Sequence, residues 1–174
     1  RRAERTRALP AAMALPPSLA SMLATVMKCG ARRPVFGSRT AKYFVELVDC
    51  CADFGGTIMV VGSPKQRNLL PGVTHAQAWE WTTTTFRDAV RRAEDRGVTI
   101  CFEPLAPAET NFINTAAEAI EFVKPFNSPA FKIIIDVKAM SSEAKPIPQI
   151  IREAWPHFAH FIQCIPGAAI FNHG

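Results

Sequence analysis

Two acidic residues, Glu103 and Asp136, are the side chains in this sequence that are best placed to do chemistry. Each ends a short apolar run, Val-Thr-Ile-Cys-Phe before Glu103 and Phe-Lys-Ile-Ile-Ile before Asp136. A strand that is buried on both faces has no use for a charge at its end unless something there binds that charge. Two carboxylates at such positions indicate a metal site, a proton-transfer site, or both.

Alternating helices and strands must position these carboxylates. Apolar residues recur at helical spacing before each apolar run, and capping boxes at Thr74 and Thr115 predict two helix starts. We expect helices over residues 43–54, 74–96, 115–124 and 147–155, and strands over 57–61, 98–103, 131–136 and 157–162, the first of these strands being buried. Crossover helices of this length make the strands parallel, so Glu103 and Asp136 share the rim at the C-terminal strand ends.

The alternation of strands and helices is compatible with a barrel or with an open, doubly wound sheet. No Gly-x-Gly-x-x-Gly follows a predicted strand, so the dinucleotide-binding version of the open sheet lacks its phosphate turn. A complete TIM barrel takes about 250 residues, whereas this chain has 174. We therefore expect an α/β fold that is a partial (β/α)8 TIM barrel, with parallel strands and outer helices.

The net charge of +5 is unevenly distributed along the chain. Residues 1–42 contain nine Lys or Arg and one acidic residue, whereas residues 43–174 contain 11 basic and 14 acidic residues. The part expected to fold is therefore mildly acidic, which argues against a nucleic-acid partner. The basic, Ala-rich N-terminal composition is typical of a transit peptide, and a mis-assembled or vector-derived end explains it equally well.

The cysteines and the hydropathy pattern bear on the compartment. The five cysteines are odd in number and show no Cys-x-x-Cys spacing, which favours reduced, buried thiols. No run approaches the roughly 20 apolar residues that a membrane-spanning helix needs. We expect a cytoplasmic protein without a membrane partner.

Several segments in a fixed order resemble a known family. They are Glu46–Gly56, Val61–Arg67, Glu103–Leu105, Thr110–Asn114 and Ile135–Glu143. Together they resemble the sugar phosphate isomerase/epimerase family with a xylose isomerase-like TIM barrel, which includes tagatose and psicose 3-epimerases. The resemblance divides the chain into a poorly assigned basic segment (1–42), a barrel portion (43–163) and a divergent C-terminal tail (164–174).

The resemblance implies a metal-dependent sugar or sugar-phosphate isomerase/epimerase that acts through an enediolate. In the family, a divalent metal, Mn or Mg rather than Zn, is held by Glu, Asp, His and a second Glu, and the two glutamates exchange a proton beside a sugar carbonyl. By position, Glu103 matches the first glutamate, as metal ligand and base, and Asp136 matches the aspartate ligand. From the residues alone, Asp136 could also cap a helix N-terminus.

The sequence departs from the family pattern after the last predicted strand begins. His160 matches the first histidine of the family's His-x-His pair, and Ile162 occupies the position of the second, which is the usual ligand. The strand with the second glutamate is not recognisable. We therefore expect metal binding to be weakened or absent, and catalysis by this chain to suffer accordingly.

Four further residues are candidate substrate contacts. His160 could face into the barrel or be a structural histidine. Lys65 and Arg67 lie in a loop at the rim, where they could bind an anionic group or remain solvated. Lys138, two residues after Asp136, would point to the same side of an extended chain and could neutralise an enediolate.

Two other function classes remain open on the sequence. The first is a non-catalytic barrel remnant or binding module that forms a homo-oligomer through its open strand edges. The second is a protein like the abasic-site endonucleases, which share this barrel but use a histidine-rich multi-zinc site. With only four histidines, the chain fits the second class less well.

Overall fold

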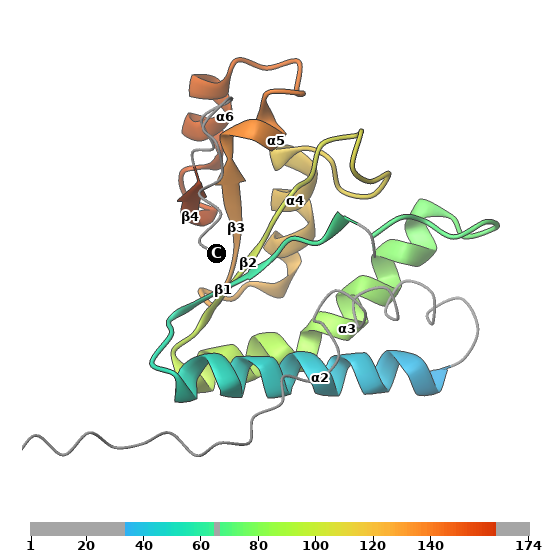
Figure 1. The fold of residues 1–174 in the computed structure, drawn as a ribbon, viewed down its shortest axis with the longest axis vertical. Helices are drawn as coiled ribbons and strands as arrows, with labels where there is room; N and C mark the ends of the chain where they lie inside the picture. Colours follow the sequence, from blue (N-terminus) through green and yellow to red (C-terminus); the bar gives the residue numbers. More distant parts are fainter. Residues whose placement is uncertain (1–33, 65–66, 163–174) are drawn as a thin grey trace, which may run out of the picture.

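The computed structural model describes residues 34–64 and 67–162, which form one parallel sheet with its helices (Figure 1). The strands are β1 (Ile58–Val61), β2 (Thr99–Phe102), β3 (Phe131–Asp136) and β4 (Phe158–Ile162). The helices are α2 (Pro34–Asp53), α3 (His75–Arg96), α4 (Ala116–Val123), α5 (Val137–Met140) and α6 (Ile147–Ala154), with a 3-10 turn η2 (Lys124–Phe126).

The order of the strands in the sheet is the order in the sequence. All neighbours pair in parallel, β1 with β2, β2 with β3 and β3 with β4. Since every crossover moves in the same direction, right-handed crossovers keep their helices on one face of the sheet. This is the arrangement of a barrel wall, and it confirms the predicted partial TIM barrel with parallel strands and outer helices.

The predicted helix starts are confirmed by their caps. Thr74 accepts a hydrogen bond from Gln77 N at the start of α3, and Thr115 accepts one from Glu118 N at the start of α4; both capping boxes are complete. Gly97 ends α3 with a φ of 66°, a left-handed conformation that a residue with a Cβ adopts at a cost. These local signals fix where α3 and α4 begin and where α3 ends.

Aromatic rings join the helices to the sheet. Phe86 of α3 lies 5.9 Å from Phe102 and 5.4 Å from Phe131, measured between ring centroids, and Phe122 of α4 lies 4.9 Å from Phe102. All four side chains are almost completely buried. Phe102 and Phe131 therefore face the helices, and the residues next to them in each strand face the opposite side, the side that a barrel encloses.

Helices α2 and α3 lie side by side below the sheet (Figure 1). The rings of Phe44 and Phe86 are 4.6 Å apart, and Arg92 donates to Asp49 Oδ1 at 2.8 Å. None of the helices in the described residues is long and apolar enough to cross a membrane.

Three sequence predictions need correction, and two others concern residues that the structure does not describe. Strand β1 is not buried, because Ile58 and Val60 are 40% and 41% exposed on a strand whose outer edge has no neighbour in the described sheet. Lys138 belongs to helix α5 and not to an extended chain. Helix α2 begins at Pro34, before the expected residue 43, and Lys65 and the tail over 164–174 lie outside the described residues.

Candidate active site

Glu103 directly follows β2 and continues its ladder, since its backbone N–H donates to the carbonyl of Val61 at 3.0 Å. The preceding Phe102 packs on the helices, so the alternation of a strand turns Glu103 toward the enclosed side of the sheet. The side chain is partly buried. The predicted rim carboxylate is therefore held by a regular strand end and is partly shielded from water.

Gly62 makes room for this carboxylate. A Cβ atom built on Gly62 would overlap Oε2 of Glu103 and would also approach its Cβ at 3.0 Å. The Glu103 side chain thus lies directly against the backbone at the end of β1. A glycine just after a strand is a signal for such a close approach, but the sequence does not say which group approaches.

Arg67 links the C-terminal ends of β1 and β2 by hydrogen bonds. Its guanidinium donates to the carbonyl of Glu103 and, at 2.7 Å, to the carbonyl of Val61. The guanidinium carbon also lies 4.3 Å from the centre of the Phe102 ring. Arg67 is only 3% exposed, so it is not a solvated loop charge. These contacts hold Arg67 within the protein. Its predicted contact with a substrate stays a prediction.

The surroundings shift the proton equilibria of both groups. Burial, the largest effect, raises the pKa of Glu103 to about 7; the Arg67 and Lys138 charges oppose this rise, and Asp136 and Glu109 add to it. Burial also lowers the pKa of Arg67 to about 10, which leaves it protonated at neutral pH. A carboxyl that titrates near neutrality can accept and return a proton at physiological pH.

Asp136 performs the capping role that the sequence left open as an alternative. Its Oδ1 accepts the backbone N–H of Lys138 at 2.9 Å and so caps α5. The rest of the carboxylate is not committed by this bond, because a carboxylate can accept several hydrogen bonds. The predicted metal-ligand role of Asp136 stays a prediction.

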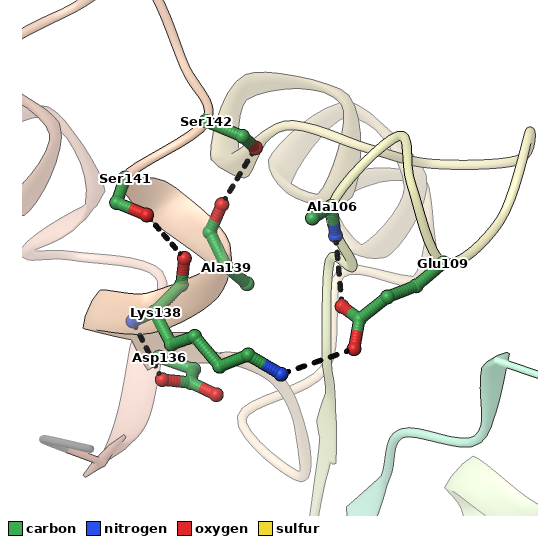
Figure 2. A network of polar contacts seen from close by, with 7 residues as sticks. All are labelled: Ala106, Glu109, Asp136, Lys138, Ala139, Ser141 and Ser142. Carbon is green, nitrogen blue, oxygen red and sulfur yellow. Dashed lines mark hydrogen bonds and ion pairs between the residues drawn. The ribbon is translucent and has the colours of Figure 1, made fainter. Parts of the chain in front are cut away.

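A third carboxylate, Glu109, lies at the same rim (Figure 2). Its Oε1 is 3.4 Å from Nζ of Lys138, and its Oε2 accepts the backbone N–H of Ala106 at 3.3 Å. The sequence analysis did not single out Glu109. Its position six residues after Glu103, in the loop that leaves the rim, was the available signal.

His160 and Ile162 occupy successive positions on the enclosed face of β4. In the register of the sheet, His160 pairs with Ile134, and Ile162 pairs with Asp136. The position directly beside Asp136 is therefore apolar, and His160 lies two residues deeper in the sheet. Within residues 34–64 and 67–162, no three His, Cys, Asp or Glu side chains are grouped so that they could hold a metal ion.

Sequential parallel strands with outer helices, and acidic side chains at the C-terminal strand ends, define the class of TIM-barrel proteins that place their sites at this rim. Residues 14–164 match the profile of the family described as xylose isomerase-like TIM barrel. The chain belongs to this family.

Individual relatives are sugar epimerases. The chain is 34% identical over 82 residues to the D-psicose 3-epimerase of Ruminiclostridium cellulolyticum. The matched segment covers 47% of the chain and 28% of the relative. The solved structure of D-psicose 3-epimerase with D-tagatose from Clostridium cellulolyticum H10 is similar with a TM-score of 0.73 and 20% identity, over 88% of the chain and 53% of that structure.

A family 2 AP endonuclease from Brucella melitensis shares the fold as well, with a TM-score of 0.60 and 19% identity over 75% of the chain and 54% of that structure. At this identity the likeness concerns the fold alone. The chain spans about half the length of these solved relatives.

Proposed function

We propose that this chain carries the proton-transfer half of a sugar epimerase site, with Glu103 as the base and a ketose of the D-psicose type as the substrate. The observation that supports this most is the Glu103 carboxyl itself, which burial brings to a pKa of about 7 at a strand-end rim. The epimerase relatives support the sugar class.

The proposed step is removal of a proton from the carbon next to the sugar carbonyl. Glu103 takes this proton, the C–H electron pair forms a C–C double bond, and the carbonyl electrons move to oxygen to give an enediolate. The ammonium group of Lys138 lies at the same rim and would stabilise the negative oxygen. Its contact with Glu109 keeps the ammonium there.

Epimerisation then requires that a proton returns to the opposite face of the same carbon. Among the described residues, one other glutamate has a raised pKa, Glu143, but its Oε1 accepts the backbone N–H of Ala116 at the start of α4. The carboxylate of Glu143 therefore serves as a hydrogen-bond acceptor at the N-terminus of α4. We propose that the returning proton comes from water, which makes this site slower than one with two opposed bases.

The described residues do not by themselves complete a metal site. Glu103 and Asp136 offer carboxylate oxygens, which suit Mn²⁺ or Mg²⁺, but the neighbour of Asp136 in β4 is Ile162 and no third donor is grouped with them. No step is therefore assigned to a metal, and the roles of Glu103 and Asp136 as ligands are open to a direct test.

Excess Mn²⁺ is expected to leave the melting temperature of the purified chain unchanged. A site with a dissociation constant of about 1 µM would stabilise the fold by about 2.7 kcal/mol when the free metal concentration is about 100 times that constant. Two carboxylates are too few to reach this affinity. Calorimetric melts with and without Mn²⁺ measure the difference. A rise that disappears in Glu103→Gln or Asp136→Asn would show a complete metal site.

Glu103→Gln is expected to lower the conversion of D-psicose into its carbon-3 epimer D-fructose by roughly 10²–10⁴-fold, since it removes the proton acceptor. Glu121→Gln, the same change at an exposed position of α4, serves as the matched control and is expected to keep full activity. Chromatography of the sugars after incubation measures both rates. Equal conversion by Glu103→Gln and the unaltered chain would refute the proposed base.

A further inference from the structure

Gly62 directly follows β1, and the Glu103 carboxyl fills the space where a side chain at that position would lie. A Cβ atom on Gly62 would be 1.4 Å from Oε2 of Glu103, 2.6 Å from its Cδ and 3.0 Å from its Cβ. Ordinary van der Waals contacts of a Cβ atom begin at about 3.4 Å. Any other residue at position 62 would therefore force the Glu103 side chain or the backbone to move.

The backbone conformation of Gly62 does not explain why glycine is needed there. Among the described residues, the glycines with a positive φ are Gly55, Gly72 and Gly97. A Cβ atom on these three would meet nothing within 4 Å, so glycine serves the left-handed backbone. At Gly62 φ is not positive, and it is space that is missing. The need for glycine at position 62 therefore comes from the Glu103 side chain.

The two strand ends cannot separate to make room without losing hydrogen bonds. The backbone N–H of Glu103 donates to the carbonyl of Val61 at 3.0 Å, and Arg67 donates to the carbonyls of both residues. The residue before Gly62 is thus held to the residue whose side chain fills the space. The Glu103 carboxyl, in contrast, ends a flexible side chain that can rotate about its own bonds. We expect a methyl group at position 62 to displace the carboxyl and to leave the strands in place.

We propose that Gly62 is a positioning residue for Glu103, because its missing side chain determines where the carboxyl lies at the rim. The consequence for catalysis rests on the proposed function, in which this carboxyl is the base. Oε2 must move by about 2 Å, from 1.4 Å to an ordinary contact distance of about 3.4 Å, if alanine replaces Gly62. A misplacement of about 1 Å is enough to cost roughly 10²-fold in rate, so one added methyl group has a large effect on proton transfer.

Deuterium uptake at carbon 3 of D-psicose in D₂O tests this consequence. We expect the rate with Gly62→Ala to fall by roughly 10²-fold or more. Gly55→Ala is the matched control, because it adds the same methyl group before the other end of β1, where nothing lies within 4 Å. Its φ of 76° disfavours alanine, so Gly55→Ala is expected to lose stability and, below its melting temperature, to keep its uptake rate. An unaltered rate with Gly62→Ala would overturn the proposal.

Crystal structures of the unaltered chain and of Gly62→Ala measure the position of the carboxyl without any sugar. We expect Oε2 of Glu103 to be displaced by about 2 Å, while the hydrogen bonds of Arg67 to the strand ends are kept. A carboxyl that stays in place would overturn the proposal. If the unaltered chain shows no deuterium uptake that depends on Glu103, the epimerase proposal fails, and the two structures alone decide the role of Gly62.

A double variant decides the question if Gly62→Ala does not fold. Glu103→Ala removes Oε2 and Cδ and leaves only the 3.0 Å approach between the two Cβ atoms, which a small adjustment relieves. Any fall in the melting temperature caused by Gly62→Ala is therefore expected to disappear when the two changes are combined, so that the double variant melts close to Glu103→Ala. If the added methyl group lowers the melting temperature equally in both backgrounds, the Glu103 carboxyl does not fill the space beside Gly62 and the proposal is wrong.

Discussion

Arg67→Met lowers the free energy of unfolding by about 3–5 kcal/mol, because it removes two charge-assisted hydrogen bonds from a buried guanidinium to backbone carbonyls. The carbonyls belong to Val61 and Glu103, at the ends of β1 and β2; the Val61 carbonyl keeps the backbone N–H of Glu103 as a donor. The methionine keeps much of the apolar volume over Phe102, so the loss reports mainly on the polar contacts. Urea or thermal unfolding of both proteins measures the difference.

Arg91→Met provides the control for this prediction. Arg91 is on the solvent side of α3, and its side chain is 74% exposed with a 3.9 Å contact to Asp88. Exposed ion pairs of this kind contribute little, so its stability is expected to stay close to that of the unaltered chain. If Arg91→Met and Arg67→Met had the same small effect, the guanidinium of Arg67 would not be holding the strand ends together.

Glu103→Gln makes the folded chain more stable than the unaltered chain at pH 8 by about 1–3 kcal/mol and leaves its stability unchanged at pH 4. The reason is that burial raises the pKa of Glu103 from 4.5 to about 7 in the folded state. The folded state therefore binds this proton more tightly than the unfolded chain does. The stabilisation that comes from this bound proton is complete below pH 4.5 and is lost as the pH rises through 7. The neutral glutamine never acquires the buried charge.

Unfolding free energies between pH 4 and pH 8 measure this effect, with Glu121→Gln as the exposed counterpart. The difference between Glu103→Gln and the unaltered chain must grow over the interval from about pH 4.5 to 7. A difference that is the same at pH 4 and at pH 8 would mean that the Glu103 carboxyl is solvated and titrates like an ordinary glutamate.

Local signals were sufficient to predict the elements that carry the site. The capping boxes at Thr74 and Thr115 depend only on residues three positions apart, and the apolar runs before Glu103 and Asp136 fill strands that are buried on both faces. The starts of α3 and α4, the parallel strands and the shared rim could therefore be predicted from the sequence. Strand β1 was misjudged as buried because its burial depends on a neighbour beyond its own residues.

The contacts around Glu103 could not be predicted, because they arise where separate strand ends meet. Arg67 resembles any loop arginine until β1 and β2 bring two carbonyl groups and the Phe102 ring to its guanidinium. Lys138 fits an extended pattern in the sequence, but the Asp136 carboxylate caps α5 and turns the chain there. The pairing of Ile162 with Asp136 follows a register shift at Ile133 and Ile134, which no periodicity reveals.

The most direct test of the Glu103 proposal is the uptake of deuterium from D₂O at carbon 3 of D-psicose, followed by NMR for the unaltered chain, Glu103→Gln and Glu121→Gln. Proton transfer by Glu103, with return from water, predicts that deuterium enters at a rate that rises with pH through about 7. The Glu121→Gln rate should match, and the Glu103→Gln rate should fall to that of the sugar alone. Deuterium uptake that is independent of Glu103, or none above the background rate, would contradict the assignment of this carboxyl as the base.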